Sequence, residues 1–170
     1  MEQAIVILPE KNNRIEKVRK KYLPDYHKYE PHITLVYPFD VEEQNALNEH
    51  IQNCLKEFKP FQITLHGLGA SAKDYFLYLL VEKGKEELIQ LHKKLNSGIL
   101  EGFKNPDMPD YIPHITLGIF QAKTELNNAI KEISKLNLTF TTTINSIQLI
   151  TVDNGHMINK KEFPLIDDIN

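Results

Sequence analysis

The chain alternates short apolar runs with amphipathic stretches. Residues 4–8 read Ala-Ile-Val-Ile-Leu, a continuous apolar run that ends at Pro9, which predicts a buried strand. Residues 11–21 are mostly charged but carry Ile15 and Val18 one turn apart, which predicts a surface helix. The same periodicities predict further strands over residues 61–65, 75–81, 138–152 and 156–164. They predict further helices within residues 41–58, 85–100 and 124–136.

One seven-residue stretch occurs twice. Residues 29–35 read Tyr-Glu-Pro-His-Ile-Thr-Leu, and residues 111–117 read Tyr-Ile-Pro-His-Ile-Thr-Leu. Only the second position differs between the copies, which lie about half the length of the chain apart. An internal repeat at this period indicates two similar halves that each supply one equivalent element.

Each copy has the composition of a strand that begins at its His. Proline is tolerated at the start of a strand, and β-branched residues follow each His. Because side chains alternate along a strand, each His should share a face with the Thr two residues later, about 6–7 Å away. The expected cleft face carries His32, Thr34 and Val36 in the first copy and His114, Thr116 and Gly118 in the second. The expected buried face carries Ile33, Leu35 and Tyr37, and Ile115, Leu117 and Ile119.

The repeat and the order of elements together predict an α+β fold. We expect two pseudo-symmetric lobes, each a mostly antiparallel sheet backed by helices, with the active cleft between the sheets. Residues 1–170 should form this single two-lobed domain. Residues 32–35 and 114–117 should be central strands related by a pseudo-twofold axis, with both His side chains pointing into one cleft.

Two imidazoles and two hydroxyls that face one another suit chemistry on a phosphodiester. Each His can act as a general acid or base near neutral pH, because its unperturbed pKa is about 6.5. Each Thr hydroxyl can donate to a phosphate oxygen. A metal site is the other use of two histidines, but His-x-Thr provides no second ligand at the Thr, so we predict no metal. A further alternative is a binding module that holds a phosphorylated ligand without turning it over.

The doubled Pro-His-Ile-Thr-Leu resembles the two His-x-Thr-x motifs of the 2H phosphoesterase superfamily. The similarity is greatest to the branch described as 2′-5′ RNA ligases or RNA 2′,3′-cyclic phosphodiesterases. The resemblance implies that His32 and His114 are catalytic and that Thr34 and Thr116 bind phosphate. It implies hydrolysis of a cyclic phosphate or a 2′-5′ phosphodiester without a cofactor. The expected partner is a small nucleotide or an RNA end.

The chain departs from that branch after the second motif, where many relatives carry an arginine. Here the stretch at 117–121 reads Leu-Gly-Ile-Phe-Gln, and the only arginines of the chain are Arg14 and Arg19. Both fall in the basic helix predicted over residues 11–21, which is either a solvated face or an outer rim that attracts phosphate. Two other histidines, His50 and His92, fall in helical patterns and are predicted to lie at the surface.

Composition restricts the partners and the compartment. The chain has 170 residues, of which 41% are hydrophobic and 25% charged, and a formal net charge of −3, as in an ordinary globular domain. It lacks the basic excess of proteins that grip long duplex nucleic acid. The lone Cys54 excludes an internal disulfide. No run is long enough to span a membrane, and the start lacks a basic signal region. We therefore expect a cytoplasmic monomer.

Overall fold

The computed structural model describes residues 2–71, 73–104 and 110–167. The strands are β1 (Glu2–Ile7), β2 (Ile33–Phe39), β3 (Phe61–Ala70), β4 (Phe76–Lys83), β5 (His114–Ile119), β6 (Thr139–Ile144), β7 (Ser146–Asp153) and β8 (His156–Pro164). The helices are α1 (Asn13–Tyr22), α2 (Gln44–Leu55), α3 (Lys85–Leu95) and α4 (Lys123–Ser134), with short 3₁₀ helices η1 (Tyr26–Lys28) and η2 (Gly98–Phe103). The predicted alternation of strands and helices is confirmed.

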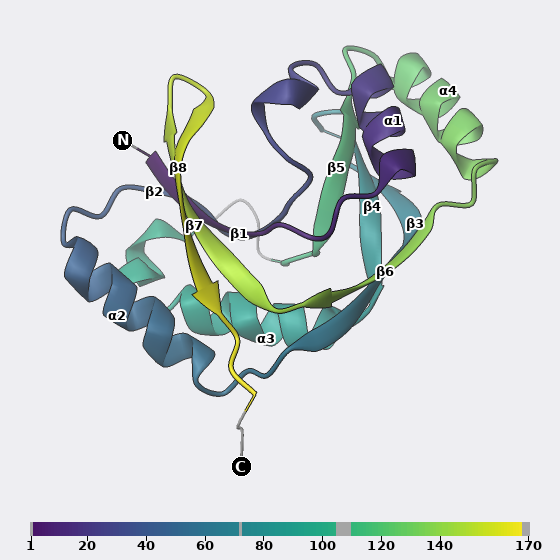
Figure 1. Cartoon of the computed structure of the whole chain (residues 1–170). Helices are drawn as coiled ribbons and strands as arrows, with labels where there is room; N and C mark the ends of the chain where they lie inside the picture. Colours follow the sequence, from purple (N-terminus) through teal and green to yellow (C-terminus); the bar gives the residue numbers. More distant parts are fainter. Residues whose placement is uncertain (1, 72, 105–109, 168–170) are drawn as a thin grey trace.

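The strands form two four-stranded antiparallel sheets (Figure 1). Sheet A has the order β2-β1-β7-β8, and sheet B has the order β5-β4-β3-β6. The two motif strands, β2 and β5, are therefore edge strands, and the prediction that they are central strands was wrong. The two edges face each other, because β2 and β5 approach within 8 Å between Cα atoms. Edge positions leave the cleft side of each motif free of a neighbouring strand.

The repeat extends beyond the motif to a unit of four elements. The first copy is β1-α1-β2-α2 and the second is β4-α3-β5-α4. In each copy the first strand pairs with the motif strand. The helix between them does not stay with its own sheet: α1 packs on β5 of sheet B, while α3 packs on β2 of sheet A as well as on β4. The two halves therefore exchange these helices (Figure 1).

Both motif strands carry a bulge at the same position. In β2, Thr34 and Val36 pair with consecutive residues of β1, so that one residue of β2 is extra. In β5, Thr116 and Gly118 likewise pair with consecutive residues of β4. The extra residue reverses the side-chain alternation beyond it. Val36 is consequently 1% exposed in the core, while Tyr37 lines the cleft beside His32. In the second copy Gly118 is buried and Ile119 lines the space beside His32. The predicted faces of Val36, Tyr37, Gly118 and Ile119 were therefore wrong.

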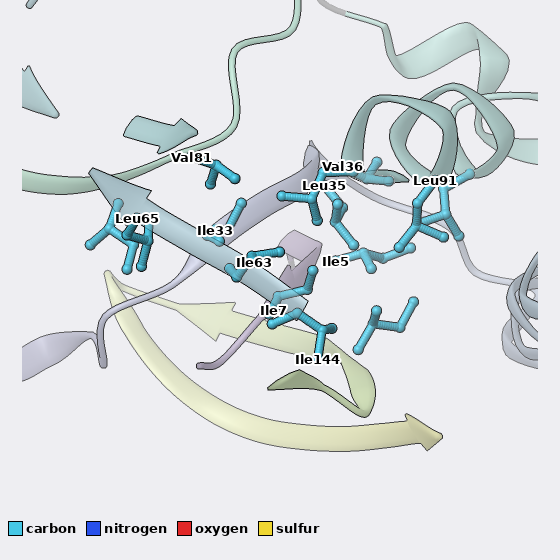
Figure 2. Packing of buried hydrophobic residues seen from close by; sticks show 14 of the residues in the cluster. Ile5, Ile7, Ile33, Leu35, Val36, Ile63, Leu65, Val81, Leu91 and Ile144 are labelled. Atoms are coloured by element: carbon cyan, nitrogen blue, oxygen red, sulfur yellow. The ribbon is translucent and has the colours of Figure 1, made fainter. Parts of the chain in front are cut away.

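One hydrophobic cluster spans both sheets and the helices. Figure 2 shows Ile5, Ile33 and Leu35 of sheet A packed with Ile63 and Leu65 of sheet B. These five residues are fully buried, so each sheet provides one wall of a shared core. The apolar residues that point to the other face of sheet A form a second small cluster, which consists of Ala4, Val6 and Ile150. This double burial explains why residues 4–8 are apolar without interruption.

The predicted strand over residues 138–152 is two strands in different sheets. β6 pairs with β3 in sheet B, and β7 pairs with β1 in sheet A. The chain changes sheets at Asn145, whose carbonyl accepts a hydrogen bond from the Leu165 amide at 2.7 Å. This crossing joins the two sheets at the end remote from the motif edges (Figure 1).

Candidate functional site

The two motif histidines are held in the same way. His32 Nδ1 lies 2.8 Å from the Glu30 carbonyl oxygen, and His114 Nδ1 lies 2.7 Å from the Ile112 carbonyl oxygen. In both cases the acceptor belongs to the residue before the proline, which a following proline restricts to extended conformations. The repeated Pro-His pair therefore fixes each imidazole ring by a bond to its own backbone.

This bond sets the tautomer of each neutral imidazole. A carbonyl oxygen can only accept, so Nδ1 of both His32 and His114 must carry a hydrogen. The lone pair of a neutral ring then lies on Nε2, which can take a proton, and a charged ring can give that proton back. Each motif thus presents one ring nitrogen, Nε2, that can act as a general acid or a general base.

Side chains from the two motifs line a common hollow. His32 of the first copy and Thr116 and Ile119 of the second line a space of about 390 Å³, which we call the interlobe hollow. His32 also lines a second space of about 230 Å³ with Thr34 and Tyr37. Strands β1 and β7 contribute four aliphatic side chains to this second space, and we call these side chains the apolar shelf: Ala4, Val6, Ile150 and Val152. Glu2 and Gln3 of β1 line the same space. Of the four motif residues, His32 and Thr116 line the interlobe hollow, His32 and Thr34 line the second space, and His114 is in neither of these two linings.

Burial lowers the pKa of both motif histidines. For His32 the desolvation is opposed by its bond to the Glu30 carbonyl and reinforced by the nearby charge of Arg19. For His114 it is opposed by the Ile112 carbonyl and reinforced by the charge of His32. The mutual effect on His114 means that the two rings are close enough for the protonation of one to disfavour that of the other. The pair therefore favours at most one protonated imidazole.

Aromatic rings restrict both imidazoles further. The Tyr78 ring of β4 lies 3.9 Å from the His114 ring, and the Tyr29 ring lies 6.2 Å from the His32 ring, both measured between centroids. Burial raises the pKa of the Tyr78 hydroxyl, which therefore stays neutral at physiological pH. These contacts fix the rings without adding charge to the cleft.

A match to a known family accompanies this geometry. Residues 7–156 match the model of the 2′-5′ RNA ligase superfamily, and this match covers most of the chain. The chain belongs to the 2′-5′ RNA ligase superfamily. The resemblance inferred from the two His-x-Thr motifs is thereby confirmed.

Similar proteins agree with this membership. A Bacillus licheniformis protein named "Putative phosphoesterase" is 29% identical over 162 residues, which cover 91% of this chain and 93% of that protein. The crystal structure of TT0787 of Thermus thermophilus is similar with a TM-score of 0.62 at 14% identity, over 97% of this chain and 98% of that one. The crystal structure of E. coli LigT complexed with 3′-AMP is similar with a TM-score of 0.55 at 17% identity, over 98% of this chain and all of that one. The predicted α+β architecture is confirmed as the fold of these structures.

One side chain of the site was misplaced by sequence reasoning. Arg19 was expected on a solvated face or an outer rim of its helix, but it is 2% exposed and lines the interlobe hollow. The sequence contains a signal for this, because Arg19 follows the buried Ile15 by one turn and adjoins the buried Val18. Arg14 lies on the exposed side of α1, as expected, and donates to the Leu136 carbonyl.

The surface position predicted for His50 and His92 was also wrong. Both are half-buried, and His92 Nδ1 lies 2.7 Å from the Leu35 carbonyl oxygen. Asn96 donates to the same oxygen at 3.0 Å. Leu35 lies at the first bulge, where the regular pairing of β2 is interrupted, so α3 supplies the partners for a backbone group that the bulge releases.

The β7–β8 hairpin closes one side of the site. Gly155 at its tip lines the interlobe hollow, and Lys160 forms an ion pair with Glu30 at 3.2 Å. Glu30 is the residue whose carbonyl holds His32. Across the described ranges, no group of three or more His, Cys, Asp or Glu side chains is arranged to hold a metal ion. No helix in the described part of the chain is long and apolar enough to cross a membrane.

Proposed function

We propose that this member of the superfamily is a metal-independent phosphodiesterase that hydrolyses a cyclic phosphate, 2′,3′ or 1″,2″, or a 2′-5′ phosphodiester. The observation that carries the proposal is the matched Nδ1–carbonyl bond of His32 and His114, which leaves Nε2 of each ring as the proton-transfer atom. Two such atoms on facing strand edges fit a reaction that needs a base and an acid at the same phosphorus.

The proton transfers balance within the pair. One imidazole takes a proton from water as the water oxygen bonds to phosphorus, and the other gives a proton to the ribose oxygen as its bond to phosphorus breaks. The Thr34 and Thr116 hydroxyls donate to the non-bridging oxygens, whose charge grows in the transition state. At the end of the cycle the two histidines have exchanged protonation states, and solvent restores them. Ligation would use the same groups in the opposite direction.

The surroundings of the histidines support a nucleotide as substrate. The apolar shelf borders the same space as His32 and Thr34, and Tyr29 and Tyr37 also line this space. Aromatic and aliphatic walls of this kind stack or pack against a nucleobase. The crystal structure of the similar E. coli LigT in complex with 3′-AMP points in the same direction. A net charge of −3 favours a small nucleotide or an RNA end over a long duplex.

The test is turnover by the purified protein in EDTA. The substrates are 2′,3′-cyclic nucleotides, ADP-ribose 1″,2″-cyclic phosphate and 2′-5′ oligonucleotides. We expect hydrolysis of at least one class, and we expect His32→Ala and His114→Ala each to lower kcat by about 10²–10⁴-fold. His66→Ala is the matched control, because His66 bonds to the Leu138 carbonyl away from the motifs. Binding of these ligands without any turnover would instead indicate a sensor module.

A further inference from the structure

Arg19 occupies an unusual position for a charged side chain. It lies in the last turn of α1 and is 2% exposed, so its charge is buried. Its Nη1 donates to Glu16 Oε1 at 2.6 Å, and its Nη2 donates to the Tyr29 carbonyl at 2.8 Å. Burying a cation costs free energy unless its donors are paired. The Glu16 carboxylate that pairs with it is itself 36% exposed, so its charge is shared with solvent.

The guanidinium has donors left over. It carries five N–H groups, and its Nε is buried without a hydrogen-bond partner among the described residues. The same side chain lines the interlobe hollow together with Lys28, His32 and Thr116. A positively charged side chain with an unpaired donor, in the wall of a hollow, has the chemistry that binds an anion. If Arg19 served only to tie α1 to the Tyr29 carbonyl, it would not need to line this hollow.

The chain places Arg19 here by the exchange of helices between the halves. α1 packs flush on β5, because a Cβ added at Gly118 would lie 2.9 Å from the Tyr22 Cβ. Gly118 follows Thr116 by two residues, and Tyr22 follows Arg19 by one helical turn. The glycine therefore lets the last turn of α1 approach the second motif closely enough for Arg19 to reach the hollow.

We infer that Arg19 is an anion-binding residue of the site, which donates from its guanidinium to a non-bridging oxygen of a phosphate held beside His32 and Thr116. This inference rests on the proposed function for the identity of the anion as a phosphodiester. Arg19 then performs for the phosphate the charge neutralisation that neither Thr hydroxyl can perform.

The position of Arg19 also makes the two histidines unequal. Its charge lowers the pKa of His32, whereas the charge that lowers the pKa of His114 is that of His32. The titratable and charged groups near His32 are Arg19, Asp25, Lys28 and Tyr29 at the interlobe hollow, Glu2 and Tyr37 at the second space, and His114; Asp25 and Lys28 pair with each other at 3.0 Å. A fixed cation that lines the same hollow as His32 favours neutral His32, the state that a general base requires.

The experiment compares Arg19→Met, Arg19→Lys and wild type, with Arg14→Met as the matched control from the same helix. Inorganic phosphate binding is followed by NMR, and hydrolysis of a 2′,3′-cyclic nucleotide is followed by steady-state kinetics. We expect Arg19→Met to weaken phosphate binding and to lower kcat/KM by about 10- to 100-fold, as for a lost hydrogen bond to a charged group. Arg19→Lys should recover part of both losses, and Arg14→Met should match wild type.

The titration of His32 by NMR tests whether the Arg19 charge acts on the site, and the phosphate affinity of the lysine variant separates an anion contact from a structural clamp. The pKa of His32 should rise in Arg19→Met, remain near wild type in Arg19→Lys, and stay unchanged in Arg14→Met. If Arg19→Met does not fold, the lysine variant still decides, because a clamp without anion contact would leave its phosphate affinity at the wild-type value. Wild-type phosphate affinity and kcat/KM in a folded Arg19 variant would overturn the inference. Absence of turnover in wild type would instead overturn the proposed function, while phosphate binding would still test Arg19.

Discussion

Tyr111 is the first residue of the second motif, and its hydroxyl donates a hydrogen bond to the Thr34 carbonyl of the first motif at 2.8 Å. Its ring stacks on His92 with centroids 3.9 Å apart and an interplanar angle of 5°. Burial raises the pKa of this hydroxyl, so it remains a donor at all physiological pH values. The two motifs are therefore joined directly beside the site, and not only through the shared core.

We expect Tyr111→Phe to lower the free energy of unfolding by about 1–3 kcal/mol, because it leaves a half-buried carbonyl without this donor. It should also lower kcat, since Thr34 then loses part of its fixed position. Urea denaturation and steady-state kinetics measure the two effects. Tyr26→Phe is the control, as the Tyr26 hydroxyl has no hydrogen bond among the described residues. Equal stability of both variants would contradict the structural role of the bond.

The two histidines should behave as a unit. We expect the double variant His32→Ala, His114→Ala to lose much less than the product of the two single losses in kcat, because either loss alone disables the paired proton transfer. A double-mutant cycle with a cyclic nucleotide measures this coupling. Strictly multiplicative losses would mean that the two rings act independently.

The Thr hydroxyls should contribute to anion affinity. Thr34→Val and Thr116→Val keep the β-branched shape and remove the donor, so we expect each to weaken phosphate binding by about tenfold. Thr143→Val is the matched control, because Thr143 is exposed on β6 of sheet B, away from the motif edge. Calorimetric titration with phosphate measures the affinities. An unchanged affinity in the double Thr variant would remove these hydroxyls from the site.

Stability should fall on acidification because of the motif histidines. Burial lowers the pKa of His32 and of His114 in the folded protein, while in the unfolded chain both titrate near 6.5. As the pH drops below about 6.5, the unfolded chain binds protons that the folded protein resists, so the free energy of unfolding decreases. Urea denaturation between about pH 7.5 and 5 should give a shallower dependence for the double variant His32→Asn, His114→Asn. An identical dependence would mean that neither ring is buried at a cost.

Gly118 should be intolerant of a side chain. A Cβ there would lie 2.9 Å from the Tyr22 Cβ and 2.9 Å from the Phe120 ring, so α1 or β5 would have to shift. We expect Gly118→Ala to destabilise the protein by about 1–3 kcal/mol and to weaken phosphate binding through displacement of Arg19. Gly102→Ala is the control, since a Cβ at Gly102 meets no atom within 4 Å. Thermal unfolding with and without phosphate separates the two effects.

The motif residues were predictable from the sequence, because the same residue types recur with the same spacing in both copies of the repeat. The strands and helices were predictable since their apolar periodicity is local, as in Ile15 and Val18 of α1. The pairing of strands is not local: nothing within residues 29–35 indicates that β2 pairs with β1 alone and forms an edge. The change of sheets at Asn145 likewise depends on β1 and β3, which lie far away in sequence.

The faces beyond each Thr could not be predicted for a different reason. Strict alternation assigns Val36 to the cleft, but a bulge inserts one residue and exchanges Val36 with Tyr37. The burial of Arg19 depends on Gly118, about a hundred positions further along the chain. A charged side chain is assigned to the surface by default; the spacing of Arg19 from Ile15 places it on the buried side of α1, and the close approach of β5 at Gly118 is what accommodates that side.

The exchange of α1 and α3 between the halves ties their folding together. If α1 detached, it would uncover β5, and if α3 detached, it would uncover β2, so each half loses its cover when the other half melts. Partial unfolding that frees one motif strand therefore also disturbs the opposite one. We therefore expect the two histidines to gain and lose their positions together, as one cooperative unit.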